Sequence, residues 1–399
     1  MKPHLTALFI ILFVTNGICQ KDTRLIESLN TMIKPITTLN PEDGYDDLLL
    51  FKEATKDADI IGIGESTHGT ALYDLYRRRL MRFLVQEMGY KAIVDEGDIL
   101  AIEKLDDYIN YKTDKPEFIG NLRPVIADVK EIDWLRSYNK DKPEAERVHI
   151  YGMEVRGFYG ILERLKEFGL FTAYDKPVLE KFTGDIGVVY KNLSKEDFDG
   201  IKKIAERLGR DCNSASCSYY ISLLDQQIDF AWLQRFGKND FNVRDKYMFE
   251  NVKSIISKTP GNKVIILAHN GHLQKTKLSG LTVLGYRLNN FYDAKYFVLA
   301  TDFNTGNVNT YNSKTGGFEN RFFEEVEDEK AVEYYFKQCK YPNFMLPVSE
   351  ALKSPVTKPF ITKKVKMLRN MSTTGDVFKF PVVLSDNYDF IAFINNTLE

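Results

Sequence analysis

Cysteine, histidine and tryptophan are scarce in this chain. Its 399 residues include only four cysteines, five histidines and two tryptophans. Small domains that are held together by disulfides need a much denser cysteine pattern, so that class of protein is excluded. Apolar residues make up 44% of the chain and charged residues 28%, which is the balance of a globular protein with a large core.

An excess of charge of one sign is also missing. The chain has 54 Lys and Arg against 56 Asp and Glu, a formal net charge of −2, and the two signs are mixed along the sequence. Proteins that bind nucleic acid or anionic lipid usually concentrate basic residues on one face. We therefore expect neither nucleic acid nor a membrane surface as a partner, and the sequence leaves the oligomeric state open.

Long apolar runs are absent beyond the first residues, so we expect no membrane span. At the N-terminus, Lys2 precedes an apolar stretch from Leu5 to Val14, and small residues follow. This pattern is typical of a secretory signal peptide and is too short to cross a bilayer. We predict a signal peptide over residues 1–19, a mature chain that begins at Gln20, and a periplasmic or secreted location. A lipid anchor on Cys19 is the less favoured alternative.

Two of the remaining cysteines are close together in "DCNSASC", residues 211 to 217. In an exported protein, Cys212 and Cys217 could close a small disulfide loop, or they could be inert thiols. The sequence leaves both interpretations open. A zinc site is not expected there, because no histidine lies near the pair.

Several short apolar runs rich in β-branched residues predict buried parallel strands, because strands covered on both faces are continuous rather than alternating. Helical segments lie between them. This order predicts an α/β fold with a largely parallel central sheet flanked by helices. The five principal runs are Ile60–Gly64, 91–96, 147–154, 262–270 and 296–303, and a last strand is expected at "YDFIAFI", residues 388 to 394.

The stretch from about 157 to 260 is mostly helical in pattern and is much longer than a crossover between two strands requires. We predict that it is a helical insertion that forms a cap over one side of the sheet. The domain as a whole is expected to extend from residue 20 to residue 399.

Charged and imidazole side chains follow four of the predicted strands. In open α/β sheets, ligands bind beyond the carboxyl ends of the strands. Any one of these residues could belong to a turn or a solvated surface, but their joint occurrence at equivalent positions indicates a shared functional site. They are Glu65 and His68 after the first strand, Asp95, Glu96 and Asp98 at the second, Glu154 and Arg156 at the third, and His269 and His272 at the fourth.

The helix expected over residues 72–88 adds an arginine to this set. At about 100° per residue, its apolar side chains occupy one arc that includes Arg77, whereas Arg78 and Arg82 point away from it. A guanidinium on a buried face needs an anionic or polar partner. The carboxylates at the strand ends are the candidates.

These motifs resemble the erythromycin esterase family. Arg77 lies twelve positions after Glu65, and Glu96 lies thirty-one positions after Glu65. The motifs that carry the resemblance are "GIGESTHGT" at 62–70, "WLRSYN" at 134–139, "IYGMEV" at 150–155, "VRDKYMFEN" at 243–251 and "ILAHNGHL" at 266–273. The third carries Glu154 where many relatives have aspartate.

The resemblance implies a hydrolase that opens a carboxylic ester or macrolactone of a small molecule, and therefore a role in macrolide resistance. His68 would be the general base that activates water, and Glu65 would orient it. Arg77, Glu96, His269 and His272 would complete the catalytic site, and the substrate would contact Arg244, Glu154 and Asn270. No cofactor is implied, and the chain has no Gly-x-Ser-x-Gly motif for a serine nucleophile.

Two other functions remain as alternatives. The carboxylates and histidines could hold zinc or iron in a metal-dependent hydrolase, although Arg77 would repel a cation. A haem- or iron-binding uptake protein of a related fold is the alternative from outside the enzymes. Such a protein would need an axial Tyr or His and an apolar slot.

Overall fold

The computed structural model describes residues 22–117, 128–184, 190–237, 240–378 and 380–397. The predicted signal peptide and the predicted start at Gln20 lie outside these residues. The chain is a mixed α/β protein with a mostly parallel central sheet flanked by helices, as the sequence predicts. It divides into two compact units: unit 1 holds the chain up to Gly89 with residues 267–280 and 285–399, and unit 2 holds residues 90–266 and 281–284.

The parallel strands of unit 1 are neighbours in its sheet. β2 pairs with β6 and β6 pairs with β11 in parallel, whereas β8 and β1 add antiparallel pairs at one side. All of β2 is buried, which explains why its sequence is apolar without alternation. The order is β1 (Lys34–Pro35), β8 (Asn343–Pro347), β11 (Phe390–Asn396), β6 (Tyr296–Asn312) and β2 (Ile60–Glu65).

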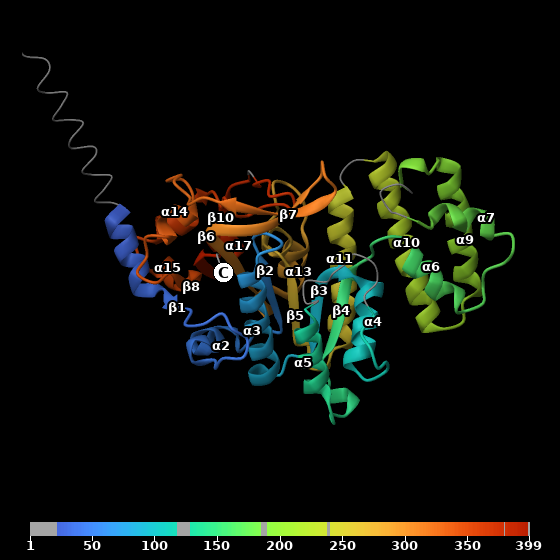
Figure 1. Cartoon of the computed structure of the whole chain (residues 1–399), viewed down its shortest axis with the longest axis horizontal. Helices are drawn as coiled ribbons and strands as arrows, with labels where there is room; N and C mark the ends of the chain where they lie inside the picture. Colours follow the sequence, from blue (N-terminus) through green and yellow to red (C-terminus); the bar gives the residue numbers. More distant parts are fainter. Residues whose placement is uncertain (1–21, 118–127, 185–189, 238–239, 379, 398–399) are drawn as a thin grey trace, which may run out of the picture. The chain divides into compact units, whose positions relative to one another are not determined.

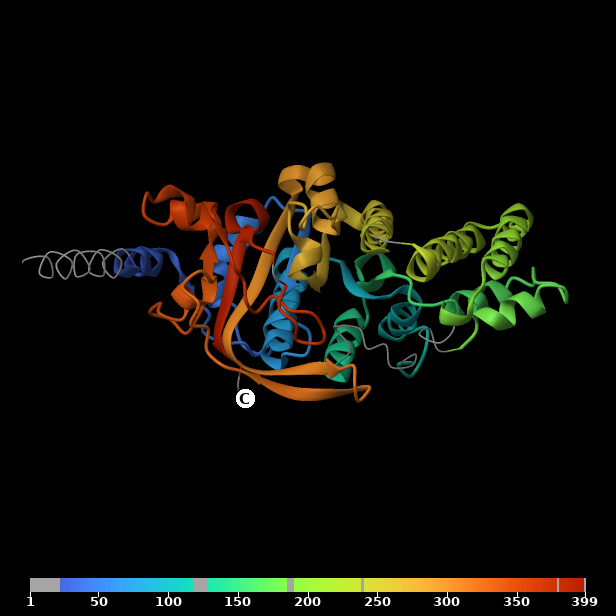
Figure 2. The ribbon, with the colours of Figure 1, turned by 90° about the horizontal axis from the view of Figure 1, so that it is seen from above.

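Strand β6 is longer than its sequence predicts. The predicted strand ends at residue 303, but β6 continues to Asn312 and pairs in antiparallel fashion with β7 (Gly317–Phe323). Figure 2 shows the two orange ribbons side by side. The second half of β6 is rich in Asn, Thr and Gly, so it lacks the apolar signal of a buried strand.

Helices and short strands complete unit 1. The long helix α3 (Ala71–Met88) follows β2 directly. The other elements are α2 (Leu49–Thr55), α12 (Asn270–Leu273), α13 (Leu284–Tyr292), α14 (Val332–Phe336), α15 (Val348–Lys353), α16 (Lys358–Thr362), α17 (Leu384–Asn387), the pair β9 (Lys364–Val365) and β10 (Val382–Val383), and the 3-10 turns η1 (Asp46–Leu48) and η5 (Asp293–Lys295).

Helix α3 is buried on more than the one arc that its sequence predicts. Arg77 is buried as expected, but the prediction that Arg82 points away from the core is wrong, because Arg82 is only 4% exposed. Residues 38–47 cover this side of the helix. Arg82 binds Glu42 at 2.6 Å, and the fully buried Arg79 binds Asp47 at 2.6 Å. Helical periodicity does not predict whether another segment of the chain covers the polar side of a helix.

Unit 2 contains the parallel pair β3 (Ala92–Asp98) and β4 (His149–Glu154) and the first residues of β5 (Val264–His269). Figure 1 shows the green helices α6, α7, α9 and α10 grouped together. The helices of this unit are α4 (Ile99–Ile109), α5 (Val129–Asn139), α6 (Tyr159–Lys166), α7 (Lys176–Leu179), α9 (Lys195–Asp211), α10 (Ala215–Phe236) and α11 (Asp240–Lys258), with 3-10 turns η2 (Glu144–Glu146), η3 (Glu180–Phe182) and η4 (Pro260–Asn262).

The long stretch between β4 and β5 is mainly helical. Its apolar core includes Phe198 and Leu224 and is shared with Ile99 and Leu100 of α4. Ser194 and Asp197 form a capping box at the start of α9. Cys212 and Cys217 form a disulfide between α9 and α10, which answers the question that the sequence left open. That this stretch caps the sheet, within one domain from residue 20 to residue 399, stays a prediction.

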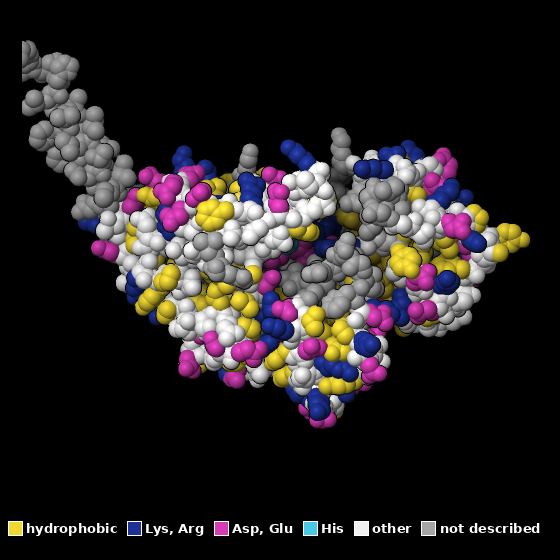
Figure 3. Space-filling model, in the orientation of Figure 1, with side chains coloured by type: hydrophobic (Ala, Val, Ile, Leu, Met, Phe, Trp, Pro, Cys, Tyr) yellow, Lys and Arg dark blue, Asp and Glu magenta, His cyan; other side chains and the backbone are white. Residues whose placement is uncertain are grey.

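The surface of the described residues carries both signs of charge. In Figure 3, Lys and Arg side chains are interspersed with Asp and Glu over the visible face. Within the described residues, none of the helices combines the length and the apolarity that crossing a bilayer would require.

Candidate active site

Strand β2 and the loop that leads to α3 position the first group of candidate residues. Glu65 is the last residue of β2, and His68 lies in the loop before α3 begins at Ala71. Gly64 and Gly69 make this tight connection feasible. A Cβ on Gly64 would lie 2.1 Å from Oδ1 of Asn270, and Gly69 has a φ of +81°, which favours glycine.

The Glu65 carboxylate contacts an imidazole through one oxygen and a guanidinium through the other. Its Oε1 lies 2.6 Å from Nδ1 of His68, and its Oε2 accepts a hydrogen bond from Nη1 of Arg77 at 2.8 Å. The Glu65 and Arg77 side chains are only 3% and 2% exposed, whereas the His68 side chain is 33% exposed. The structure therefore brings these three predicted residues together, and solvent reaches only the imidazole.

The charges around Glu65 determine its protonation and that of its neighbour. Burial alone would raise the pKa of Glu65, but the Arg77 guanidinium and the His68 imidazole outweigh it and lower that pKa below its usual value. The carboxylate is thus ionised at neutral pH. Because the ionised Glu65 can only accept a hydrogen bond, Nδ1 of His68 must carry the ring proton. In the neutral ring, Nε2 is therefore the nitrogen that can accept a proton.

His269 lies beside His68 but has a different environment. The two ring centroids are 5.5 Å apart. Nδ1 of His269 accepts a hydrogen bond from the Gly271 N–H at 3.1 Å, and Nε2 lies 3.0 Å from the carbonyl oxygens of both Ser66 and Met371. These contacts fix a neutral ring with its proton on Nε2. The catalytic role of His269 stays a prediction, but the backbone sets its orientation.

Two further predicted residues lie on the short helix α12. Asn270 is fully buried, and its amide binds the backbone of Thr301 through both ends, with Nδ2 donating at 2.8 Å and Oδ1 accepting at 3.3 Å. Asn270 therefore ties α12 to β6. His272 is 5% exposed. The contact of Asn270 with substrate and the catalytic role of His272 stay predictions.

The other predicted residues form a charge cluster in unit 2. Arg244, on α11, donates to Oε1 of Glu96 at 2.8 Å and to Oε2 of Glu154 at 2.6 Å. Arg156 donates to Glu154 at 2.7 Å and to the Glu96 carbonyl at 3.0 Å. Burial opposes the charge of Glu154, but Arg244 and Arg156 lower its pKa. Two carboxylates and two guanidiniums thus balance one another.

Asp98, which the sequence places among the strand-end acids, caps a helix. Its carboxylate accepts the N–H of Ala101 at 2.9 Å and that of Arg156 at 2.6 Å. Burial is the largest influence on its pKa, which is raised. A helix cap is the simpler explanation for an aspartate at this position. Asp95 is fully buried on β3.

Asp74 is a titratable residue near His68 that the sequence reasoning missed. It lies in the first turn of α3, one turn before Arg77. Burial and the neighbouring Glu65 charge raise the pKa of Asp74 to about 6. Its position three residues before Arg77 was the available signal, because residues three apart share a face of a helix.

The contacts of Glu65 are unfavourable for binding a metal ion. Among the described residues, no group of three or more His, Cys, Asp or Glu side chains is arranged to hold one. Glu65 has its two oxygens directed at His68 and Arg77, and a guanidinium is an unfavourable neighbour for a cation.

Comparison with known proteins identifies the family. The erythromycin esterase family model matches residues 85–183 and 226–397. The chain belongs to the erythromycin esterase family. Erythromycin esterase type II of Escherichia coli is 21% identical over 379 residues, with 80% of this chain and 88% of the relative covered. The resemblance seen in the sequence motifs is therefore confirmed.

Solved structures agree on the fold. A Bacillus cereus protein aligns with a TM-score of 0.78 and 23% identity, with 94% of this chain and 98% of that chain covered. A mutant of the erythromycin esterase EreC in its open conformation aligns with a TM-score of 0.71 and 18% identity, over 91% of this chain and 97% of that chain. At these identities the likeness shows the erythromycin esterase fold alone. The haem-binding protein ChaN of Campylobacter jejuni aligns with a TM-score of only 0.30, so it carries no argument for haem.

Proposed function

We propose that this protein hydrolyses a carboxylic ester of a small molecule with water that His68 activates. One observation supports this most. Nδ1 of His68 is held at 2.6 Å by Glu65, a buried carboxylate whose other oxygen binds Arg77 at 2.8 Å. An imidazole held in this way has a defined tautomer and a defined direction, which a general base needs.

The reaction follows from the protonation states. Nε2 of neutral His68 takes a proton from water as the water oxygen attacks the ester carbonyl. The ring becomes an imidazolium beside the ionised Glu65, which stabilises the positive charge. Collapse of the tetrahedral intermediate releases the alcohol, and the imidazolium returns its proton to the leaving oxygen. A base of this kind contributes about 10²- to 10⁴-fold to the rate.

Arg77 acts in this scheme through Glu65. Its guanidinium is 2% exposed, and Nε and Nη2 are buried without a hydrogen-bond partner among the described residues. It therefore holds the Glu65 carboxylate ionised and in place, and Glu65 in turn holds His68. This geometry favours a positioning role for Arg77 over direct contact with the reacting ester.

The substrate is proposed to be an ester or macrolactone, and for a macrolide the reaction would confer resistance. A panel of 14- and 16-membered macrolides and simple esters, followed by mass spectrometry, tests this directly. Hydrolysis of a macrolactone adds the mass of one water in a single product, whereas a simple ester gives an acid and an alcohol. If no member of either class is converted, the proposed function is wrong; conversion of simple esters alone would reject the macrolide assignment.

Activity is expected to survive exhaustive chelation. A divalent metal beside the Arg77 guanidinium would meet a repulsion of about 4 kcal/mol per unit charge pair at about 4 Å in an effective dielectric near 20. The measurement is the hydrolysis rate of protein whose metal content has been shown by mass spectrometry to be negligible. Apo protein that stays inactive until zinc or iron is returned would support the metal-dependent alternative instead.

Export is proposed from the apolar stretch Leu5–Val14 and the small residues that follow it. Protein isolated from its native host is expected in the periplasm or the medium, with Gln20 as its first residue. N-terminal sequencing of the isolated protein checks this. A chain that begins at Met1 would contradict it, and a lipid-modified Cys19 would support the anchored alternative.

A further inference from the structure

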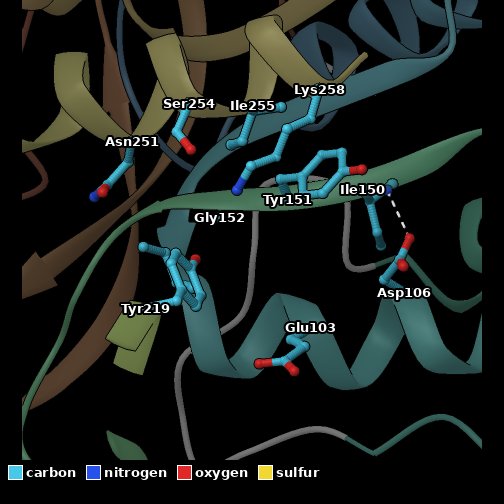
Figure 4. Close-up of a pocket in the computed structure, with 11 residues that line it drawn as sticks. Glu103, Asp106, Ile150, Tyr151, Gly152, Tyr219, Asn251, Ser254, Ile255 and Lys258 are labelled. Atoms are coloured by element: carbon cyan, nitrogen blue, oxygen red, sulfur yellow. Dashed lines mark hydrogen bonds between the residues drawn. The ribbon is translucent and has the colours of Figure 1, made fainter. Parts of the chain in front are cut away.

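Unit 2 contains a pocket that the hydrolysis scheme does not use. Its volume is about 250 Å³, and it is lined by residues of α4, β4, α10 and α11. Figure 4 shows β4 with Tyr151 and Gly152, and the side chain of Lys258 reaching from α11 toward them. None of Glu65, His68 and Arg77 lines this pocket.

The pocket lies along the outer edge of β4. On the side of β4 that faces β3, the N–H of His149 binds the Lys91 carbonyl at 2.9 Å. The N–H of the next residue, Ile150, points to the opposite side and binds Oδ1 of Asp106 at 2.9 Å. Backbone groups alternate in direction along a strand. The next groups to face outward are therefore the carbonyl of Ile150 and the N–H of Gly152, and both residues line the pocket.

Two acidic side chains also line the pocket, and each accepts hydrogen bonds from neighbouring groups. Asp106 accepts from Ile150, from Asn110 at 3.0 Å and from His149 at 3.1 Å. Oε1 of Glu103 accepts the Tyr220 hydroxyl at 2.6 Å and Arg164 at 3.1 Å. Arg164 pairs with Glu103 and offsets its negative charge, although Oε2 of Glu103 is buried without a hydrogen-bond partner among the described residues. The donors to Asp106 occupy its oxygens without adding a formal positive charge.

Lys258 differs from these acids. Its ammonium lies 5.7 Å from the centre of the Tyr219 ring, and it forms no ion pair with a carboxylate among the described residues. Burial is the main reason why the pKa of Tyr219 is raised to about 12, so this ring stays neutral at physiological pH. The pocket thus offers an ammonium that has no ion-pair partner in the described part of the chain, next to an aromatic surface.

Apart from Asn251 and Ser254, the remaining walls are mainly apolar, and the volume limits the size of a ligand. Ile99, Ile150 and Ile255 line the pocket together with the rings of Tyr151 and Tyr219. A volume of about 250 Å³ lies below the roughly 300–1,000 Å³ that is usual for drug-sized ligands. A macrolide is therefore too large, and a single ring or a short branched chain suits the pocket.

We propose that this pocket binds a small carboxylate with a flat apolar body. The carboxylate pairs with the Lys258 ammonium and accepts the outward N–H of Gly152, and the apolar body packs against Tyr219 and Ile255. Charge-assisted hydrogen bonds to a carboxylate are among the stronger polar contacts in proteins. The proposal does not depend on ester hydrolysis, because it rests on residues of unit 2 alone.

Isothermal titration of the full mature protein with phenylacetate and with its neutral analogue phenylacetamide tests the proposal. We expect phenylacetate to bind at least about tenfold more tightly than the amide, as the loss of a hydrogen bond to a charged group would predict. Lys258→Met should remove this preference. Lys202→Met is the matched control, because Lys202 is also exposed and also lies over an aromatic ring, that of Trp232 at 5.5 Å, but does not line the pocket.

A carboxylate could also bind at the proposed catalytic residues as a reaction product. Phenylacetate binding should therefore be unchanged in His68→Ala. If phenylacetate binding is lost in His68→Ala but retained in Lys258→Met, the ligand binds at the proposed catalytic residues, and the proposal is overturned. Equal affinity for the acid and the amide, or no binding of phenylacetate, would overturn it as well.

Discussion

His68→Ala is expected to lower kcat by at least about 10²-fold on any ester that the wild-type protein hydrolyses. This is the lower limit for the loss of a general base, because the water then keeps its proton in the transition state. The side chain is 33% exposed, so its truncation opens little buried space and folding should stay intact. Steady-state kinetics and a thermal melt on the same preparation measure the two effects separately.

His149→Ala is the matched control for this variant. His149 also has a carboxylate partner, since its Nδ1 lies 3.1 Å from Oδ2 of Asp106, but it belongs to unit 2. It should keep kcat within a few fold of the wild-type value. If His68→Ala retains near-normal kcat, His68 is not the base, whatever the effect of the control.

Arg77→Ala is expected to destabilise the folded protein by about 3–5 kcal/mol, the usual result of removing one partner from a buried ion pair. Glu65 would then be left buried beside His68 without its guanidinium, since both side chains of the pair are almost fully buried. A loss of kcat is expected too, because Arg77 holds Glu65 in place, and the burial of both partners adds a loss of stability. Urea unfolding measures it. Lys353→Ala breaks an exposed pair with Glu350 and should cost less than about 1 kcal/mol.

The pH dependence of the stability difference between the wild-type protein and Arg77→Ala gives a second readout of the role of Arg77. The pKa of Glu65 is lowered in the folded state, so its ionisation contributes stability that is fully present above its ordinary value of 4.5 and is lost as the pH falls through the folded-state pKa. Arg77→Ala removes the largest favourable charge and raises that folded-state pKa. The stability gap between wild type and variant should therefore narrow as the solution is acidified below about pH 4.5. A gap that stays constant with pH would contradict the assigned role of Arg77.

The strands that the sequence predicts are those whose signal is local. β2, β3, β4, β5 and β11 are short apolar runs, and all form close to the predicted positions. β8 and the hairpin of β6 with β7 were missed for different reasons. β8 is only five residues long, and Pro342 and Pro347 interrupt the apolar run around it. β7 is largely exposed, so pairing with β6 rather than burial makes it a strand.

In the candidate site, too, the sequence predicts contacts between residues that are close in the chain but not contacts with distant segments. The spacing of Glu65, His68 and Arg77 predicted their proximity, because a strand end, a loop and the first turns of a helix are close in the sequence. The carbonyl of Met371, which fixes His269, comes from a distant loop that carries no motif. The burial of Arg79 and Arg82 depends on residues 38–47, a segment that lies well before α3 in the sequence and also carries no motif.

Glu65→Gln tests the central claim most directly, because it changes a charge and almost no volume. Arg77 donates to one oxygen of Glu65, so the amide oxygen of the variant must face Arg77 and its NH₂ must face Nδ1 of His68. Nδ1 then becomes an acceptor, the ring proton moves to Nε2, and His68 can no longer take a proton from water. The account predicts a folded protein whose kcat on an identified ester substrate is at least about 10³-fold below the wild-type value, by analogy with the roughly 10⁴-fold loss when the triad aspartate of a serine protease becomes asparagine. A folded Glu65→Gln variant with kcat within about tenfold of wild type would contradict it.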